Sequence, residues 1–134
     1  MRNDIWLLSR LDFIWSKYFA DISQVNPLFI KFGRYSKYRL GSIRLDRKSR
    51  KTFITITSMF KNEKIPTAVI DHTIAHELIH YTHGFSSVHP KLHKYPHAGG
   101  VVKREMVVRG MQHLYTAYQD WIKLYRQLLT KRNV

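Results

Sequence analysis

Residues 66–84, PTAVIDHTIAHELIHYTHG, are the stretch around which the rest of the chain is organised. Pro66 favours a helix start, because its missing N–H would have no partner in the first helical turn. Gly84 can adopt the left-handed conformation that ends a helix. Between them, apolar residues recur at helical spacing and give the segment one buried side: Val69, Ile70, Ile74, Leu78 and Ile79. The stretch therefore predicts a helix of about five turns.

Two histidines stand four residues apart within this predicted helix. His76 and His80 would lie one turn apart on one face, about 5–6 Å between their Cβ atoms, so both imidazoles can reach one tetrahedral zinc ion. Glu77 points to the side of that face, where it can hold a water beside the metal without binding the metal. This is the H-E-x-x-H pattern of zinc-dependent peptidases. The chain has 8 histidines in 134 residues, so a chance match has odds of roughly one in a hundred and the motif needs support from its context.

A catalytic zinc ion takes three protein ligands and keeps one position open for water, so a third ligand must come from elsewhere in the chain. The candidates are His83, His89, His93, His97 and Glu105. His97 follows a loop long enough to reverse the chain and stands where the next helix is expected to begin. From that rigid position its imidazole can face the first helix. Glu105, about two turns further on, would complete a site of two histidines and one glutamate, and remains the alternative to His97.

His72 and His83 lie near the same face of the predicted helix, each too far along its axis to share an ion with His76 and His80. We interpret His72, or Asp71, as a group that orients a ligand imidazole. His83 is interpreted as a residue favoured by the helix dipole at the C-terminal end. A surface position is the alternative for either histidine.

The composition limits the class of protein. A chain of 134 residues that is 44% hydrophobic can form one domain with one core. It has no cysteine, which excludes disulfides, cysteine-ligated zinc and a cysteine nucleophile. No signal-peptide core is visible, and no apolar run approaches the roughly 20 residues that cross a bilayer. We expect a cytoplasmic protein without a membrane partner, with a nucleoid- or nucleus-associated location as the alternative.

The positive charge is large and unevenly distributed. The chain has 23 Lys and Arg against 9 Asp and Glu, a formal net charge of +14, and residues 31–51 carry nine basic residues against Asp46 alone. Such a field attracts polyanions, including DNA. The expected contact residues are Arg34, Lys37, Arg39, Arg44, Arg47, Lys48, Arg50 and Lys51. A solvated basic surface is the alternative interpretation.

The segments before the histidine helix predict one helix and three strands. Residues 4–22 have the apolar spacing of an amphipathic helix, which Asn26-Pro27 ends. Residues 28–32, 38–45 and 52–57 predict strands, and the last is the clearest because it alternates and is β-branched. The basic loop between the last two predicts a hairpin. The simplest assembly is a three-stranded antiparallel sheet.

Helical spacing returns after the histidine-rich loop. It begins after Gly99-Gly100 and continues to about residue 129, with Gly110 as a point that divides or weakens the helix. The complete pattern predicts an α+β domain: an N-terminal helix, a small sheet, the histidine helix and a C-terminal helix or helix pair.

Several segments, in order, are similar to those of a known family. GSIR (residues 41–44) leads into FITI (53–56), DHTIAHELIH (71–80) follows, and PHAGGVVKREM (96–106) places His97 seventeen residues after His80. From about Asn26 to Gly110 the chain resembles the SprT-like (Spartan-related) zinc metallopeptidase domain. Residues 96–106 are similar to the family's His-Gly-x-x-Phe-Lys stretch, whose histidine is the third zinc ligand. Ala98 and Val102 replace the family's Gly and Phe, and the C-terminal zinc ribbon of many members has no counterpart here.

The resemblance implies a fold and a chemistry. The fold would be a zincin-like minimal metallopeptidase, one domain over residues 1–134 in which residues 111–134 are a helical extension. One Zn²⁺ would be held by His76, His80 and His97. Glu77 would act as the base when a metal-activated water hydrolyses a peptide bond of a protein or peptide substrate. The family includes a DNA-dependent protease, so nucleic-acid-associated proteins are the expected substrates.

Two other functions fit the residues. The chain could be a basic nucleic-acid-binding module in which the metal site is structural or vestigial. It could also be a latent, self-inhibited peptidase, in which a nearby histidine, Glu105 or the C-terminal tail occupies the open metal position.

Overall fold

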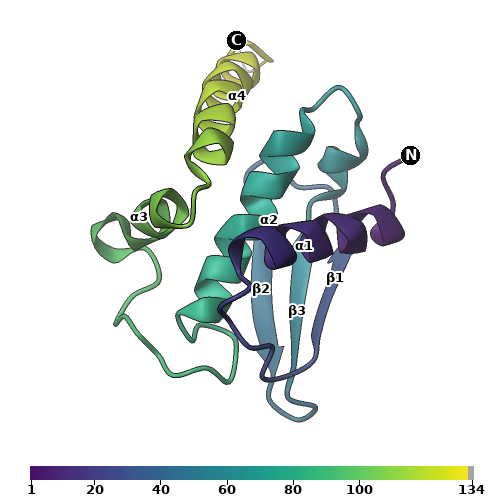
Figure 1. The fold of residues 1–134 in the computed structure, drawn as a ribbon. Helices are drawn as coiled ribbons and strands as arrows, with labels where there is room; N and C mark the ends of the chain where they lie inside the picture. Colours follow the sequence, from purple (N-terminus) through teal and green to yellow (C-terminus); the bar gives the residue numbers. More distant parts are fainter. Residues whose placement is uncertain (133–134) are drawn as a thin grey trace.

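A computed structural model describes residues 1–132. It is an α+β structure of four α-helices and a small mixed sheet, which agrees with the expected class (Figure 1). The helices are α1 (Asp4–Tyr18), α2 (Thr67–Thr82), α3 (Val101–Val108) and α4 (Gln112–Arg132). The strands are β1 (Leu28–Phe32), β2 (Gly41–Asp46) and β3 (Lys51–Ile56). Two 3₁₀ helices, η1 (Ser58–Lys61) and η2 (Ala98–Gly100), precede α2 and α3.

The prediction of an antiparallel sheet is wrong in one pairing. β2 and β3 form the expected antiparallel hairpin, but β1 pairs with β3 in parallel, from Leu28 opposite Thr52 to Phe32 opposite Ile56. The strand order is β1-β3-β2, so residues 33–40 carry the chain past the end of β3 to its far edge. β3 is the central strand. Alternation in a sequence identifies a strand but not its neighbours, and the sequence therefore did not reveal this order.

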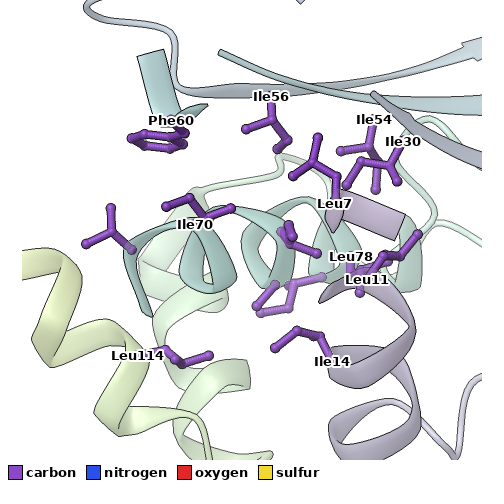
Figure 2. Packing of buried hydrophobic residues seen from close by; sticks show 14 of the residues in the cluster. Leu7, Leu11, Ile14, Ile30, Ile54, Ile56, Phe60, Ile70, Leu78 and Leu114 are labelled. Atoms are coloured by element: carbon purple, nitrogen blue, oxygen red, sulfur yellow. The ribbon is translucent and has the colours of Figure 1, made fainter. Parts of the chain in front are cut away.

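The hydrophobic core lies between one face of the sheet and the helices α1 and α2 (Figures 1 and 2). Ile30, Ile54 and Ile56 point from the strands toward this core. α1 and α2 supply Leu7, Leu11, Ile14, Ile70 and Leu78, and α4 adds Leu114 from the other side of α2. α2 is consequently buried on nearly every side, which fixes the residues that it carries.

α1 ends at Tyr18, four residues before the predicted end. Phe19 leaves the helical conformation, with φ −127°, and its side chain is fully buried in the core. The carbonyl oxygen of Tyr18 accepts a hydrogen bond from Arg109 (2.8 Å), which replaces a continued helical bond. A residue far along the chain therefore satisfies a backbone carbonyl at the end of this helix.

The C-terminal helical segment is divided at Gly110, as the sequence allowed. Gly110 has φ +83°, a left-handed conformation that glycine adopts without steric strain. Met106 and Met111, on either side of the break, are both buried, so α3 and α4 each pack on the body of the protein. Within residues 1–132, none of the helices combines the length and the apolar character that a membrane span requires.

Candidate metal centre

The three histidines favoured by the sequence converge at one point. α2 presents His76 and His80 from successive turns, and the long loop after α2 returns His97 to them at the start of η2. Their Nε2 atoms form a triangle with sides of 3.0 Å (His76–His80), 3.0 Å (His80–His97) and 3.2 Å (His76–His97). These histidines are the group of His and acidic side chains, among the described residues, that lies close enough together to bind a metal ion.

Three imidazole nitrogens at these separations can hold a cation between them. A neutral imidazole nitrogen either donates or accepts a hydrogen bond, but not both. Hydrogen bonds therefore cannot account for all three nitrogen–nitrogen contacts of the triangle. A metal ion satisfies all three lone pairs together. Tetrahedral coordination at the usual zinc–nitrogen length would separate the nitrogens by about 3.3 Å, close to the separations in this triangle. The donor set therefore fits a divalent metal that accepts imidazole ligands.

The surroundings keep His76 and His80 neutral. Burial, together with the neighbouring His72 and His97, lowers the pKa of His76 to about 4. Burial and the adjacent imidazoles lower the pKa of His80 to about 3. Both rings therefore carry free lone pairs at neutral pH, which metal binding requires.

Glu77 lies beside the triangle, and its side chain is only 4% exposed. Burial raises the pKa of its carboxyl group to about 7, and the charge of Arg39 opposes part of that shift. A carboxyl group with a pKa near neutrality can both accept and return a proton. Glu77 and the three histidines line the same cleft.

The cleft has a volume of about 570 Å³ and lies between α2 and β2. Its β2 side consists of residues 38–43, and its other wall includes His72, Phe85, Pro96 and Tyr118. Gly41 allows the close approach of the two elements. A Cβ at Gly41 would lie 2.7 Å from Cγ2 of Thr73 and 3.6 Å from Cγ of Glu77. The absent side chain of Gly41 therefore brings the edge of the sheet next to the metal centre.

His72 is buried, 6% exposed, so the surface alternative is wrong for it. Its ring stacks flat on Tyr118 of α4, with centroids 4.1 Å apart and planes 5° apart, and lies 6.3 Å from the ring of His76. Burial lowers its pKa to about 4. Asp71, the other candidate to orient a ligand, is held elsewhere, because Arg10 of α1 pairs with both of its oxygens.

Tyr118 is a residue of the site that sequence reasoning missed. It lies within the C-terminal segment of helical spacing, where an aromatic residue is typical of a core position. No local signal distinguishes a core tyrosine from one that stacks on a histidine of another helix. Its position depends on the packing of α4 against α2.

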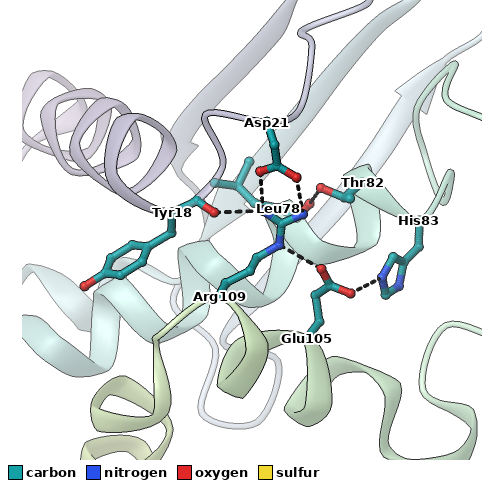
Figure 3. A network of polar contacts seen from close by, with 7 residues as sticks. All are labelled: Tyr18, Asp21, Leu78, Thr82, His83, Glu105 and Arg109. Atoms are coloured by element: carbon teal, nitrogen blue, oxygen red, sulfur yellow. Dashed lines mark hydrogen bonds and ion pairs between the residues drawn. The ribbon is translucent and has the colours of Figure 1, made fainter.

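Glu105 lies in a separate network (Figure 3). One carboxylate oxygen contacts Nε2 of His83 (3.1 Å), and the other accepts a hydrogen bond from Nε of Arg109 (2.8 Å). Arg109 also pairs with Asp21, on the connection between α1 and β1. His83 ends α2, as expected, but is only 2% exposed, so the surface alternative is wrong for it too. The structure thus brings His97, and not Glu105, to the histidine pair.

The basic residues expected to contact nucleic acid are all exposed. Arg39 lines the metal cleft. Arg44 and Lys51 lie instead over Phe53 and Phe29, aromatic residues of β3 and β1. Arg47, Lys48 and Arg50 are at the β2–β3 turn, and Arg34 and Lys37 are on the β1–β2 connection.

Comparisons of the chain with protein-family models, with curated proteins and with solved structures gave no match.

Proposed function

We propose that this chain is a zinc-dependent metallopeptidase with a zincin-like fold of the SprT-like type. The observation that supports it most strongly is the triangle of His76, His80 and His97 beside the buried carboxyl group of Glu77. Three imidazole ligands suit zinc, and three protein ligands would leave one coordination position for a reactant. A general base next to that position is what hydrolysis requires.

Each residue has a distinct part in the proposed reaction. His76, His80 and His97 would hold the ion, which when bound supplies Lewis-acid activation of a water and of the peptide carbonyl. Glu77 accepts the proton of the attacking water and returns it to the leaving amine. His72 stacks on Tyr118 and its ring lies near that of His76, so it would help to orient that imidazole.

The edge of the sheet supports a peptide as the substrate. β2 pairs with β3 along one edge, and its residues Ser42 and Ile43 line the cleft along the other. An extended peptide can add to an exposed edge through main-chain hydrogen bonds, which do not depend on its sequence. Such a peptide would run past Glu77 and the histidine triangle.

The test uses metal content and cleavage together. The purified protein is expected to contain about one zinc per chain, and removal of the metal by a chelator should abolish cleavage of a denatured protein or a quenched peptide pool. Glu77→Gln should keep the zinc and lose activity by at least about a hundredfold, because the general base is absent. Glu63→Gln, a surface change, is the matched control. Unchanged cleavage by Glu77→Gln would refute the role of Glu77.

Nucleic-acid binding is a second candidate, which a specific arrangement favours. On the sheet face opposite the helices, Phe29 and Phe53 stack with centroids 5.5 Å apart, and Phe29 is 46% exposed. Arg44 lies 4.6 Å from the centre of the Phe53 ring, and Lys51 lies 5.7 Å from that of Phe29. Exposed aromatic rings flanked by cations suit the unpaired bases and phosphates of a single strand.

Its test is a binding titration with single-stranded DNA at several salt concentrations. Phe29→Ala and Arg44→Gln should each weaken binding several-fold, and Arg44→Gln should also reduce the salt dependence. Phe13→Ala is the matched control, since Phe13 of α1 is equally exposed and also lies beside two cations, Arg10 and Lys17. Equal effects of Phe29→Ala and Phe13→Ala would argue against this surface.

A further inference from the structure

The cleft of the candidate metal centre contains a basic residue for which the proposed hydrolysis has no role. Glu77 is the acidic residue among the residues that line it, and Arg39 is the residue with a permanent positive charge. A divalent cation on the three histidines would add further positive charge. A cleft of this kind favours substrates that carry negative charge near the reacting bond.

The backbone around Arg39 is held firmly at the mouth of the cleft. The backbone N–H of Arg39 donates to Oγ of Ser36 (2.9 Å). Oγ1 of Thr57 accepts a hydrogen bond from the backbone N–H of Ser36 and donates to its carbonyl, and the N–H of Thr57 donates to the carbonyl of Leu40. Two residues after Arg39, Gly41 packs on Thr73 and Glu77 of α2. The loop therefore presents Arg39 at a fixed place.

Within residues 1–132, the guanidinium of Arg39 forms no ion pair. Among the ion pairs and side-chain hydrogen bonds of residues 1–132, none involves the Arg39 side chain, which is exposed. Arg10 and Arg109, by contrast, are each paired with carboxylates. Arg39 and Glu77 line the same cleft. Arg39 is thus available to a ligand in the cleft.

We propose that Arg39 is a specificity residue that binds a carboxylate of the peptide substrate beside the scissile bond. This inference rests on the proposed peptidase function and names the class of peptide that the site would take. A guanidinium offers two parallel N–H donors to a carboxylate, a geometry that an ammonium group cannot reproduce. The carboxylate can come from an Asp or Glu side chain or from a free C-terminus, and both would meet the same donors.

The first experiment measures selectivity in cleavage. Peptides of one sequence are compared in four forms: with Glu or Gln next to the scissile bond, each with a free or an amidated C-terminus. We expect KM for the form with the preferred carboxylate to be about tenfold lower than for the fully neutral form. Comparing the Glu and Gln forms tests a side-chain carboxylate, and comparing the free and amidated forms tests the C-terminal carboxylate. In Arg39→Gln the KM ratio between the two forms should fall to near one.

Two further variants distinguish a specific role of the Arg39 guanidinium from a general effect of net charge. Arg39→Lys should keep part of the selectivity, because the charge remains and the paired donors are lost. Arg126→Gln, on the exposed part of α4, changes the net charge equally and should keep the full KM ratio. A tenfold preference that survives Arg39→Gln would overturn the proposal, as would an equal loss in Arg126→Gln. Matching thermal midpoints would show that Arg39→Gln is folded.

The second experiment does not depend on catalysis. The zinc-loaded Glu77→Gln protein is titrated with the same peptides carrying a fluorescent label, and binding is followed by anisotropy. Binding that favours the carboxylate forms about tenfold, and loses this preference when Arg39→Gln is added, supports the proposal even if the wild type cleaves nothing. Cleavage without selectivity would overturn the role of Arg39 while leaving the peptidase function intact. Binding of neutral and acidic forms with equal affinity would also overturn it.

Discussion

His97 differs from the other two histidines of the metal centre in how it is held. His76 and His80 are carried by the buried helix α2, whereas His97 is exposed and stands at the end of a long loop. Its imidazole nevertheless lies within 3.2 Å of both partners. A bound cation would therefore also fix the loop, and the metal and the loop conformation should depend on each other.

Replacing His97 should separate the two possible third ligands. His97→Ala removes one of three donors and should lower zinc affinity by at least about a hundredfold, more than the loss of a group that only orients a ligand. Glu105→Gln should leave zinc affinity nearly unchanged, because Glu105 is engaged by His83 and Arg109. Competition with a chromophoric chelator measures both values. Equal losses of zinc affinity in His97→Ala and Glu105→Gln would indicate that Glu105 is a ligand.

At the scale of elements, the network of Figure 3 joins three parts of the chain. Arg109, at the end of α3, donates to the Tyr18 carbonyl at the end of α1 and pairs with Asp21 and Glu105. Its side chain is largely buried, so removal of the guanidinium would leave the partly buried acceptors on Tyr18 and Glu105 without this partner. Arg109→Ala should lower the free energy of unfolding by about 2–3 kcal/mol in urea titrations. Arg126→Ala is the control.

The same network predicts how stability depends on pH. Burial alone would raise the pKa of Glu105, but the hydrogen bonds and charges of His83 and Arg109 outweigh it and hold the pKa below its ordinary value. The hydrogen bond from Arg109 likewise lowers the pKa of Asp21. Carboxyl groups with a lowered pKa stabilise the fold above their ordinary pKa and lose that contribution as the pH falls. Stability should therefore decline below about pH 4.5, and less steeply in Glu105→Gln.

Gly110 separates α3 from α4 by its backbone conformation alone. A Cβ added there would meet no atom within 4 Å, so the effect of Gly110→Ala isolates the cost of φ +83°. We expect a loss of about 1–2 kcal/mol in the free energy of unfolding, with a smaller loss for Gly110→Asn, because asparagine tolerates this conformation. An unchanged urea midpoint for Gly110→Ala would show that the break between the helices can shift.

At the scale of the whole molecule, the N-terminus secures the segment that leads into α2. The side chain of Arg2 is only 6% exposed and donates to the carbonyls of Phe60, Asn62 and Ile65. These carbonyls belong to η1 and to the connection that ends at Pro66. Arg2 therefore fixes the start of the helix whose middle carries the metal ligands, over a sequence separation of about sixty residues.

Removing this link should destabilise the fold and spare the metal centre. Arg2→Ala leaves several buried carbonyls without donors and should cost about 2–3 kcal/mol in the free energy of unfolding. Zinc affinity measured under native conditions should change less than about threefold, since the histidines are held by other contacts. Lys64→Ala is a surface control. A loss of zinc affinity parallel to the loss of stability would show that the metal site depends on this link.

The sequence by itself determined the elements and most of the candidate ligands. Helical spacing between Pro66 and Gly84 places His76, Glu77 and His80 on one helix, and alternation identifies the strands. These are local properties: a turn of helix or a pleat of strand depends on a few neighbouring residues. His97 was also within reach of the sequence, because the loop length and the following helix start restrict where the chain can return.

Only the tertiary structure decided which elements lie side by side. It made β3 the central strand, turned Glu105 toward His83 and Arg109, stacked Tyr118 on His72 and set Arg39 at the mouth of the cleft. Each of these arrangements depends on contacts between segments far apart in the chain. The free energy that stabilises the contacts comes from burial and from interaction partners that no local sequence pattern encodes. Local patterns thus place His76 and His80 on one helix, while long-range packing decides what surrounds the candidate metal ligands.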